Sequence, residues 1–108
     1  MIAVLFEMWP AESGRDEYFA RAAALRPLVD SIDGFLGVER FESLTEPGKV
    51  LSLSFFRDEL AVAEWRAQAE HRAAQKRGRE ALFRHYRVRV AAVLRDYGKP
   101  PATLRTRP

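Results

Sequence analysis

Three side chains that could take part in acid–base chemistry lie close together in the second half of the chain: Trp65, His71 and Gln75. His71 is the candidate base, because the unperturbed pKa of an imidazole lies near neutrality. His71 and Gln75 are four positions apart, so in a helix they share one face and could line a site together. Trp65 offers an aromatic wall or an indole donor. Such a set is suited to removing a proton from an activated phenol or enol.

A site that removes this proton must also stabilise the anion that results. Tyr86, Arg87 and Arg89, near the C-terminus, are candidates for that role. The predicted catalytic residues are Trp65, His71, Tyr86 and Arg87, and the predicted substrate-binding residues are Gln75, Phe6 and Phe55.

Structural uses of these residues remain open. A Trp on an amphipathic helix commonly fills a core or an interface. His71 lies between Glu70 and Arg72, so an exposed or salt-bridged imidazole is equally consistent with the sequence. For His85 we favour a surface position. Since no second His stands near His71, we predict no metal site.

Charge is distributed unevenly along the 108 residues. Up to Glu64 there are six Lys and Arg against twelve Asp and Glu, and from Trp65 onward there are twelve against three. No RNA-binding or recognition-helix motif accompanies the basic half, so we expect a solvated or intersubunit surface and no nucleic acid. Arg87, Arg89 and Arg95 share one side of the last predicted strand and could pair with Glu7 or Glu39 across the sheet or between subunits.

Length and composition predict one domain over residues 1–98, followed by an arm or disordered tail over residues 99–108. The chain has no cysteine, which excludes disulfides and thiolate nucleophiles and fits a reducing compartment. No signal-peptide pattern is present, and no apolar stretch approaches the roughly 20 residues that cross a bilayer. We therefore expect a cytoplasmic protein that has no membrane partner.

The hydrophobic pattern predicts two helices and four strands. Strands are expected at residues 2–10, 35–44, 50–56 and 86–94. A helix is expected from about Asp16, with Ser13 as N-cap, loosened at Pro27 and ended by Asp33–Gly34. The second helix, capped by Asp58, is expected over residues 59–66 and again over 70–83, with a hinge near residues 68–69.

This βαββαβ order is typical of a ferredoxin-like α+β fold, a four-stranded antiparallel sheet with both helices on one face. The uncovered face of such a sheet is normally polar. Here the first strand carries Ile2, Val4, Phe6 and Met8 on one side but also Ala3, Leu5 and Trp9 on the other. A two-fold partner packed sheet on sheet would cover that second face, so we expect a homodimer.

Residues 64–75 resemble the antibiotic biosynthesis monooxygenase family, small dimeric α+β barrels whose second helical region carries a Trp followed by a polar, His-containing turn. Residues 34–37, Gly-Phe-Leu-Gly, and residues 52–58, Ser-Leu-Ser-Phe-Phe-Arg-Asp, agree with this resemblance. It extends from Met1 to about Tyr97. The resemblance implies a dimeric α/β barrel with a pocket between the sheet and the helices.

The resemblance implies two active branches. One oxidises aromatic or quinol-type substrates with dioxygen and no cofactor, and this is the function we predict. The other binds and degrades haem, with an axial His about three helical turns after the Trp, where this chain has Gln75, and an Asn in the first strand, where it has Glu7 or Met8. Haem is therefore the disfavoured alternative, and a non-catalytic dimeric ligand-binding protein is a third.

Overall fold

The structure is a computed structural model that describes residues 1–12, 14–76 and 83–99, with only the backbone described for residues 70–76. The elements follow in the order β1 (Ile2–Pro10), α1 (Arg15–Asp30), β2 (Phe35–Glu42), β3 (Val50–Phe56), α2 (Glu59–Lys76) and β4 (Phe83–Ala92). The expected C-terminal tail lies almost wholly outside the described residues.

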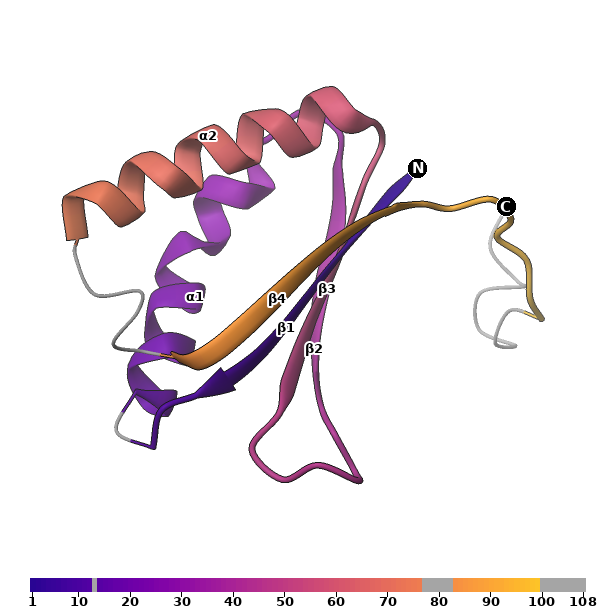
Figure 1. Ribbon diagram of the computed structural model, residues 1–108. Helices are drawn as coiled ribbons and strands as arrows, with labels where there is room; N and C mark the ends of the chain where they lie inside the picture. The colour runs from indigo at the N-terminus through magenta and orange to yellow at the C-terminus, as the bar shows by residue number, and fades with distance from the viewer. Residues whose placement is uncertain (13, 77–82, 100–108) are drawn as a thin grey trace.

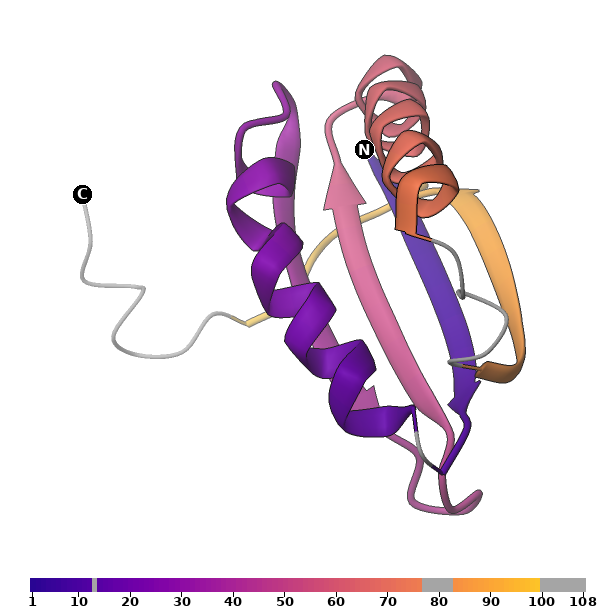
Figure 2. The same cartoon turned by 90° about the vertical axis from the view of Figure 1, so that its left-hand side faces the viewer.

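The four strands form one sheet in the order β2-β3-β1-β4, and every neighbouring pair is antiparallel. Both helices lie on the same face of this sheet (Figures 1 and 2). The predicted ferredoxin-like α+β fold is therefore confirmed. Below, the two faces are called the helix face and the helix-free face.

The alternation along β1 decides which side chains enter the core. Met8 is fully buried and packs with Val50 and Phe83, and Phe6 packs against this cluster on the helix face. Ile2 and Val4 pack against a second cluster, which contains Phe56 and the helix residues Val29, Ile32, Ala61 and Val62. The even-numbered residues of β1 thus hold the helices on the sheet, because alternate side chains of a strand share a face.

The helix α1 begins after Gly14, which holds the N-cap position without a side-chain cap, while the expected cap Ser13 lies outside the described residues. The helix continues past Pro27 and ends at Asp30, a little earlier than expected. Gly34 then turns the chain into β2 with a φ of +92°, a conformation that favours glycine.

The prediction of a hinge near residues 68–69 is wrong, because α2 is continuous from Glu59 to Lys76. Gln and Ala are favourable helix residues, so nothing in the local sequence breaks the helix there. Its N-cap is Asp58 as predicted, with the Asp58 carboxylate accepting a hydrogen bond of 2.9 Å from the Ala61 N–H.

Three strand boundaries also differ from the sequence prediction, and one is the C-terminal end of β4, which lies at Ala92 and not at Leu94. Phe83 was expected at the end of the second helix but begins β4, where its buried ring packs beside Phe6 and Tyr18. The second strand ends at Glu42, two residues early, because the Ser43 hydroxyl accepts hydrogen bonds from the Thr45 and Glu46 N–H groups and forms a turn.

Within the described part of the chain, nothing covers the helix-free face. Its row of apolar side chains includes Leu5 on β1, Leu53 and Phe55 on β3 and Phe41 on β2, all of them partly exposed or exposed. The sheet is therefore apolar on both sides, as the sequence predicted. No helix among the described residues has the length and apolar character needed to span a bilayer.

Candidate functional site

An aromatic cluster lies on the helix face where β1 and β4 run side by side. The rings of Phe6 and Tyr86 stack with their centroids 5.5 Å apart and 8° between their planes. Phe83 meets both of these rings at a steep angle, with centroids 5.7 Å and 5.9 Å away, and Tyr18 of α1 meets Phe83 at 5.3 Å. The cluster is thus assembled from three elements, with Phe6 and Phe83 facing inward.

Tyr86 is 47% exposed, so part of its side chain is available to a ligand. Val88 and Val90 continue the same row of β4 and are also about half exposed, at 46% and 49%. The main contacts of the helices are those of α1 with β2 and of α2 with β3. These two strands are separated from β4 by β1, and β4 forms the opposite edge of the sheet from β2. The helix face therefore carries an open apolar strip beside the aromatic cluster.

The other predicted residues of the helix face lie on α2. Trp65 is partly buried and packs against the core cluster of Phe56 and Val62, which gives it a structural role whatever else it does. His71 and Gln75 follow it on the same unbroken helix, but their side chains lie outside the described residues. The structure therefore brings Phe6 and Tyr86 together and puts Trp65 on the same side of the sheet.

Arg87 and Phe55 are on the opposite side of the sheet from Phe6 and Tyr86. Arg87 pairs in register with Glu7, and Phe55 pairs with Ala3, so both share the helix-free face with the odd-numbered residues of β1. Successive residues of a strand point to opposite faces, so the Tyr86 ring and the Arg87 guanidinium lie on opposite sides of the sheet.

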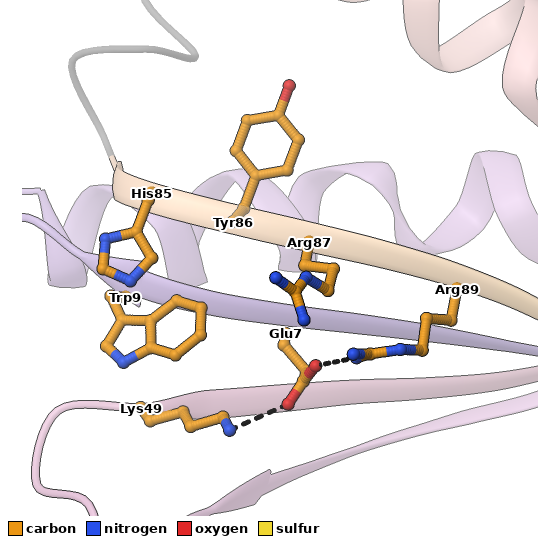
Figure 3. Close-up of a pocket in the computed structure, with 7 residues that line it drawn as sticks. All are labelled: Glu7, Trp9, Lys49, His85, Tyr86, Arg87 and Arg89. Carbon is orange, nitrogen blue, oxygen red and sulfur yellow. Dashed lines mark hydrogen bonds and ion pairs between the residues drawn. The ribbon is translucent and has the colours of Figure 1, made fainter.

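A second group of polar residues, not assembled by the sequence analysis, lies on the helix-free face around Glu7 (Figure 3). One Glu7 oxygen accepts a hydrogen bond of 2.8 Å from the Lys49 ammonium, and the other accepts one from the Arg89 guanidinium. The pairing of Arg89 with Glu7, one of the partners proposed from sequence, is confirmed. The bond from Lys49 lowers the pKa of Glu7, and Arg89 lowers it further against the opposing effect of partial burial.

This group surrounds a depression of about 350 Å³, the Glu7 pocket, lined by Glu7, Trp9, Lys49, His85, Tyr86, Arg87 and Arg89. The Trp9 and His85 rings are 4.0 Å apart, and the Lys49 ammonium lies 5.1 Å from the Trp9 ring. Figure 3 shows the Tyr86 ring pointing away from the other six side chains. A signal for the pocket was present in the sequence, since Glu7 interrupts an apolar strand and the aromatic Trp9 follows on the same face.

Over the described residues, no group of three or more His, Cys, Asp or Glu side chains is arranged to hold a metal ion. Of the two histidines, His85 stacks on Trp9 on the helix-free face, and the side chain of His71 is outside the described residues. The described side chains thus offer aromatic walls and a phenol hydroxyl on the helix face, and a carboxylate, an imidazole and cations on the helix-free face.

The structure places the chain in the class of small ferredoxin-like α+β proteins, and sequence comparison makes the assignment specific. Residues 1–77 match the antibiotic biosynthesis monooxygenase family. The chain belongs to this family, which confirms the resemblance found in its sequence.

Among its relatives, the jasmonate monooxygenase of Pyricularia oryzae is 45% identical over 93 residues, which are 86% of this chain. The chain spans only 43% of the length of that relative. The solved structure of Rv0793 from Mycobacterium tuberculosis matches with a TM-score of 0.74 at 23% identity, covering 90% of this chain and 98% of that one. The haem degrader MhuD of the same organism, solved with two haems bound, matches with a TM-score of 0.71 at 16% identity over 91% of this chain and 100% of that one. These two structures support the fold alone.

Proposed function

We propose that this protein is a monooxygenase that oxidises a small aromatic or quinol-like substrate with dioxygen, without a cofactor, on the helix face of its sheet. The observation that carries the proposal is the stacked Phe6–Tyr86 pair beside an open apolar strip, in a chain that belongs to this family. A flat substrate fits such a surface, because aromatic rings stack favourably in offset or edge-to-face arrangements.

The proposed chemistry begins with removal of a proton from an activated CH₂ or hydroxyl group of the substrate. The resulting anion gives its electrons to dioxygen. For an activated CH₂ group, one oxygen atom becomes the product carbonyl and the other leaves as water. For a hydroquinone, one oxygen atom enters the ring as a hydroxyl group, the ring is oxidised to a quinone, and the other oxygen atom leaves as water. Neither reaction requires an external reductant. His71 is the proposed base, and Gln75, four residues later on α2, lies on the same side of that helix.

Tyr86 and Trp65 have different roles in this scheme. The Tyr86 hydroxyl is the proposed donor to the developing anion, because it is carried by a ring that the Phe6 stack holds in place. Trp65 is the proposed far wall of the substrate site, and its packing on the Phe56 cluster holds it against the sheet. Catalysis in a site of this kind depends on holding the substrate away from water.

The described residues fit haem poorly, which supports a reaction without it. The haem-degrading branch uses a His as axial ligand, and the one described imidazole, that of His85, is on the helix-free face. In β1, Glu7 points to the same helix-free face and is bound by Lys49 and Arg89, while Met8 is fully buried. Neither residue offers the helix face a polar group.

We further propose that the protein acts as a homodimer in which two sheets pack through their helix-free faces. Leu5, Leu53 and Phe55 give this face an apolar area that a partner would remove from water. Glu39 lies in the same row as Leu5 and Leu53 and has no ion-pair partner among the described residues, so it is the acidic residue best placed for an intersubunit pair. Glu42, the acidic residue at the end of β2, already pairs with Arg15 on the helix face.

Sedimentation over a range of concentrations tests this assembly. We expect a dimer for the natural chain and a shift toward monomer for Leu53→Asp, because a buried carboxylate without a partner is costly. Leu60→Asp is the matched control, since Leu60 is 81% exposed on α2 and should leave the dimer intact. A natural chain that stays folded and monomeric at high concentration would overturn the dimer.

Oxygen uptake tests the proposed activity. The panel consists of anthrones, hydroquinones and jasmonate, the last because the 45% identical relative is named for it. We expect uptake that depends on at least one of these substrates and that falls roughly 10-fold or more in Tyr86→Ala, a loss typical of removing one transition-state donor. Tyr97→Ala, at an 87% exposed tyrosine beyond β4, is the control and should retain the natural rate. An equal loss of oxygen uptake in both variants would show that Tyr86 is not part of the substrate site.

A further inference from the structure

The Glu7 pocket carries more positive charge than its own carboxylate neutralises. Lys49 forms an ion pair with one carboxylate oxygen of Glu7, and Arg89 forms an ion pair with the other. Arg87 stands directly opposite Glu7 in the register of β1 and β4, on the same face, yet it forms no ion pair or hydrogen bond within the described part of the chain. Three cationic side chains therefore line the pocket against one carboxylate.

One wall of the pocket is flat and fixed. The Trp9 indole N–H donates to the Glu46 carboxylate, which ties this ring to the turn between β2 and β3. His85 lies against the ring on the β4 side at 4.0 Å and 34°, and Lys49 contacts it on the β3 side. An unpaired guanidinium thus stands beside a fixed aromatic surface in a depression of about 350 Å³.

We propose that the Glu7 pocket binds a small organic carboxylate with a flat apolar body. The carboxylate pairs with Arg87, whose guanidinium can make two parallel hydrogen bonds to it, and the flat body lies on the Trp9–His85 wall. Because Glu7 already uses Lys49 and Arg89, the pocket offers a single free guanidinium, which suits a monoanion better than a multiply charged phosphate. A depression of this volume holds a ligand of one or two rings.

This site does not depend on the proposed oxygenase activity. The Glu7 pocket opens on the helix-free face, whereas Phe6 and the Tyr86 ring are on the helix face. It lies at the β1–β4 edge of that face and borders the apolar row that would face a second subunit, since its lining residue Arg89 is the cross-strand partner of Leu5.

Calorimetric titration of the full chain with 1-naphthoate, and with its neutral amide 1-naphthamide, tests the proposal. We expect saturable binding of naphthoate, with the amide at least about tenfold weaker, because the pairing requires a negative charge. Arg87→Gln should weaken naphthoate by about tenfold or more, and Arg87→Lys by less, because an ammonium keeps the charge but loses the two parallel bonds. Arg95→Gln removes the same charge from a residue outside the pocket and should leave the affinity unchanged.

Several results would overturn the proposal. These are no saturable binding by naphthoate, equal binding of the amide, or equal affinity in the natural chain and a folded Arg87→Gln variant. Displacement of naphthoate by inorganic phosphate at equal concentration would also overturn it, since the site would then be a general anion site. So would a large gain in affinity in Glu39→Gln, because Arg87 would then be occupied by the Glu39 carboxylate of a second copy.

Discussion

Phe6 and Tyr86 lie parallel across neighbouring strands, with 8° between their rings and 5.5 Å between their centroids. Their contact gives Tyr86 two separable functions, since the ring packs and the hydroxyl can donate. Tyr86→Phe keeps the ring, so we expect unchanged stability and slower oxidation. Tyr86→Ala removes both and should also lower the free energy of unfolding by about 1 kcal/mol, the worth of such an aromatic pair. Urea unfolding and initial rates measure these effects. A Tyr86→Phe variant with the natural rate would assign Tyr86 to packing alone.

Glu7 is held by two cations, and its ion pairs should make stability depend on pH. Lys49 first and Arg89 next lower the pKa of Glu7 in the folded chain below the ordinary value of 4.5. A carboxyl whose folded pKa is depressed contributes its stability above the unfolded pKa and loses it as the pH falls through the folded value. The stability gained from Glu7 should therefore be complete at neutral pH and disappear in acid, below the ordinary range of the group.

Glu7→Gln tests this dependence, because the amide keeps the size and loses the charge. We expect the natural chain to lose more stability than Glu7→Gln between neutral pH and about pH 3 in urea titrations. Glu12→Gln serves as the control, because Glu12 forms no ion pair among the described residues, and its pH profile should match the natural one. Parallel profiles for the natural chain and Glu7→Gln would show that the two ion pairs are broken in solution.

Gly34 connects α1 to β2 in a conformation that other residues rarely adopt, with a φ of +92°. A Cβ atom there would stand 3.1 Å from that of Ala61 and 3.3 Å from that of Arg57, so it would press on the start of α2. The Gly34 carbonyl also accepts a hydrogen bond of 2.7 Å from the Arg57 N–H, which holds the backbone in place. We expect Gly34→Ala to cost about 1–3 kcal/mol in the free energy of unfolding.

Gly98→Ala is the matched control for Gly34, because a Cβ at Gly98 meets nothing within 4 Å. Thermal unfolding should show a clear drop for Gly34→Ala and little change for Gly98→Ala. Equal midpoints for the two variants would mean that the α1–β2 connection can rearrange, and the close approach of Gly34 to Ala61 would then be unimportant for stability.

The sequence predicted the fold well because its signals are local. The alternation of Ile2, Val4, Phe6 and Met8, the turn around Pro47–Gly48 and the Asp58 cap each act within a few residues, and the order of elements follows from them. The hinge near residues 68–69 was predicted wrongly because no helix-breaking residue is present there. Phe83 was assigned to a helix because its burial depends on contacts with Phe6 and Tyr18, which are distant in sequence.

The candidate site was harder to predict, because it depends on strand register. Tyr86 and Arg87 were grouped as anion stabilisers, yet neighbouring residues of a strand point to opposite faces. Phe55 was grouped with Phe6, yet its pairing with Ala3 places it on the helix-free face. The contact of Lys49 with Glu7 joins residues 42 positions apart, and only the pairing of β1 with β3 brings them together.

We propose above that this chain inserts an oxygen atom from dioxygen into an organic substrate without a cofactor. The most direct measurement is product mass spectrometry after reaction under ¹⁸O₂, with protein freed of metal by a chelator and of haem by refolding. We expect a product that carries one ¹⁸O atom, formed at an undiminished rate by the natural chain and roughly 10-fold or more slowly by Tyr86→Ala. A product without ¹⁸O, or a reaction that appears only when haem or a metal ion is added, would contradict it.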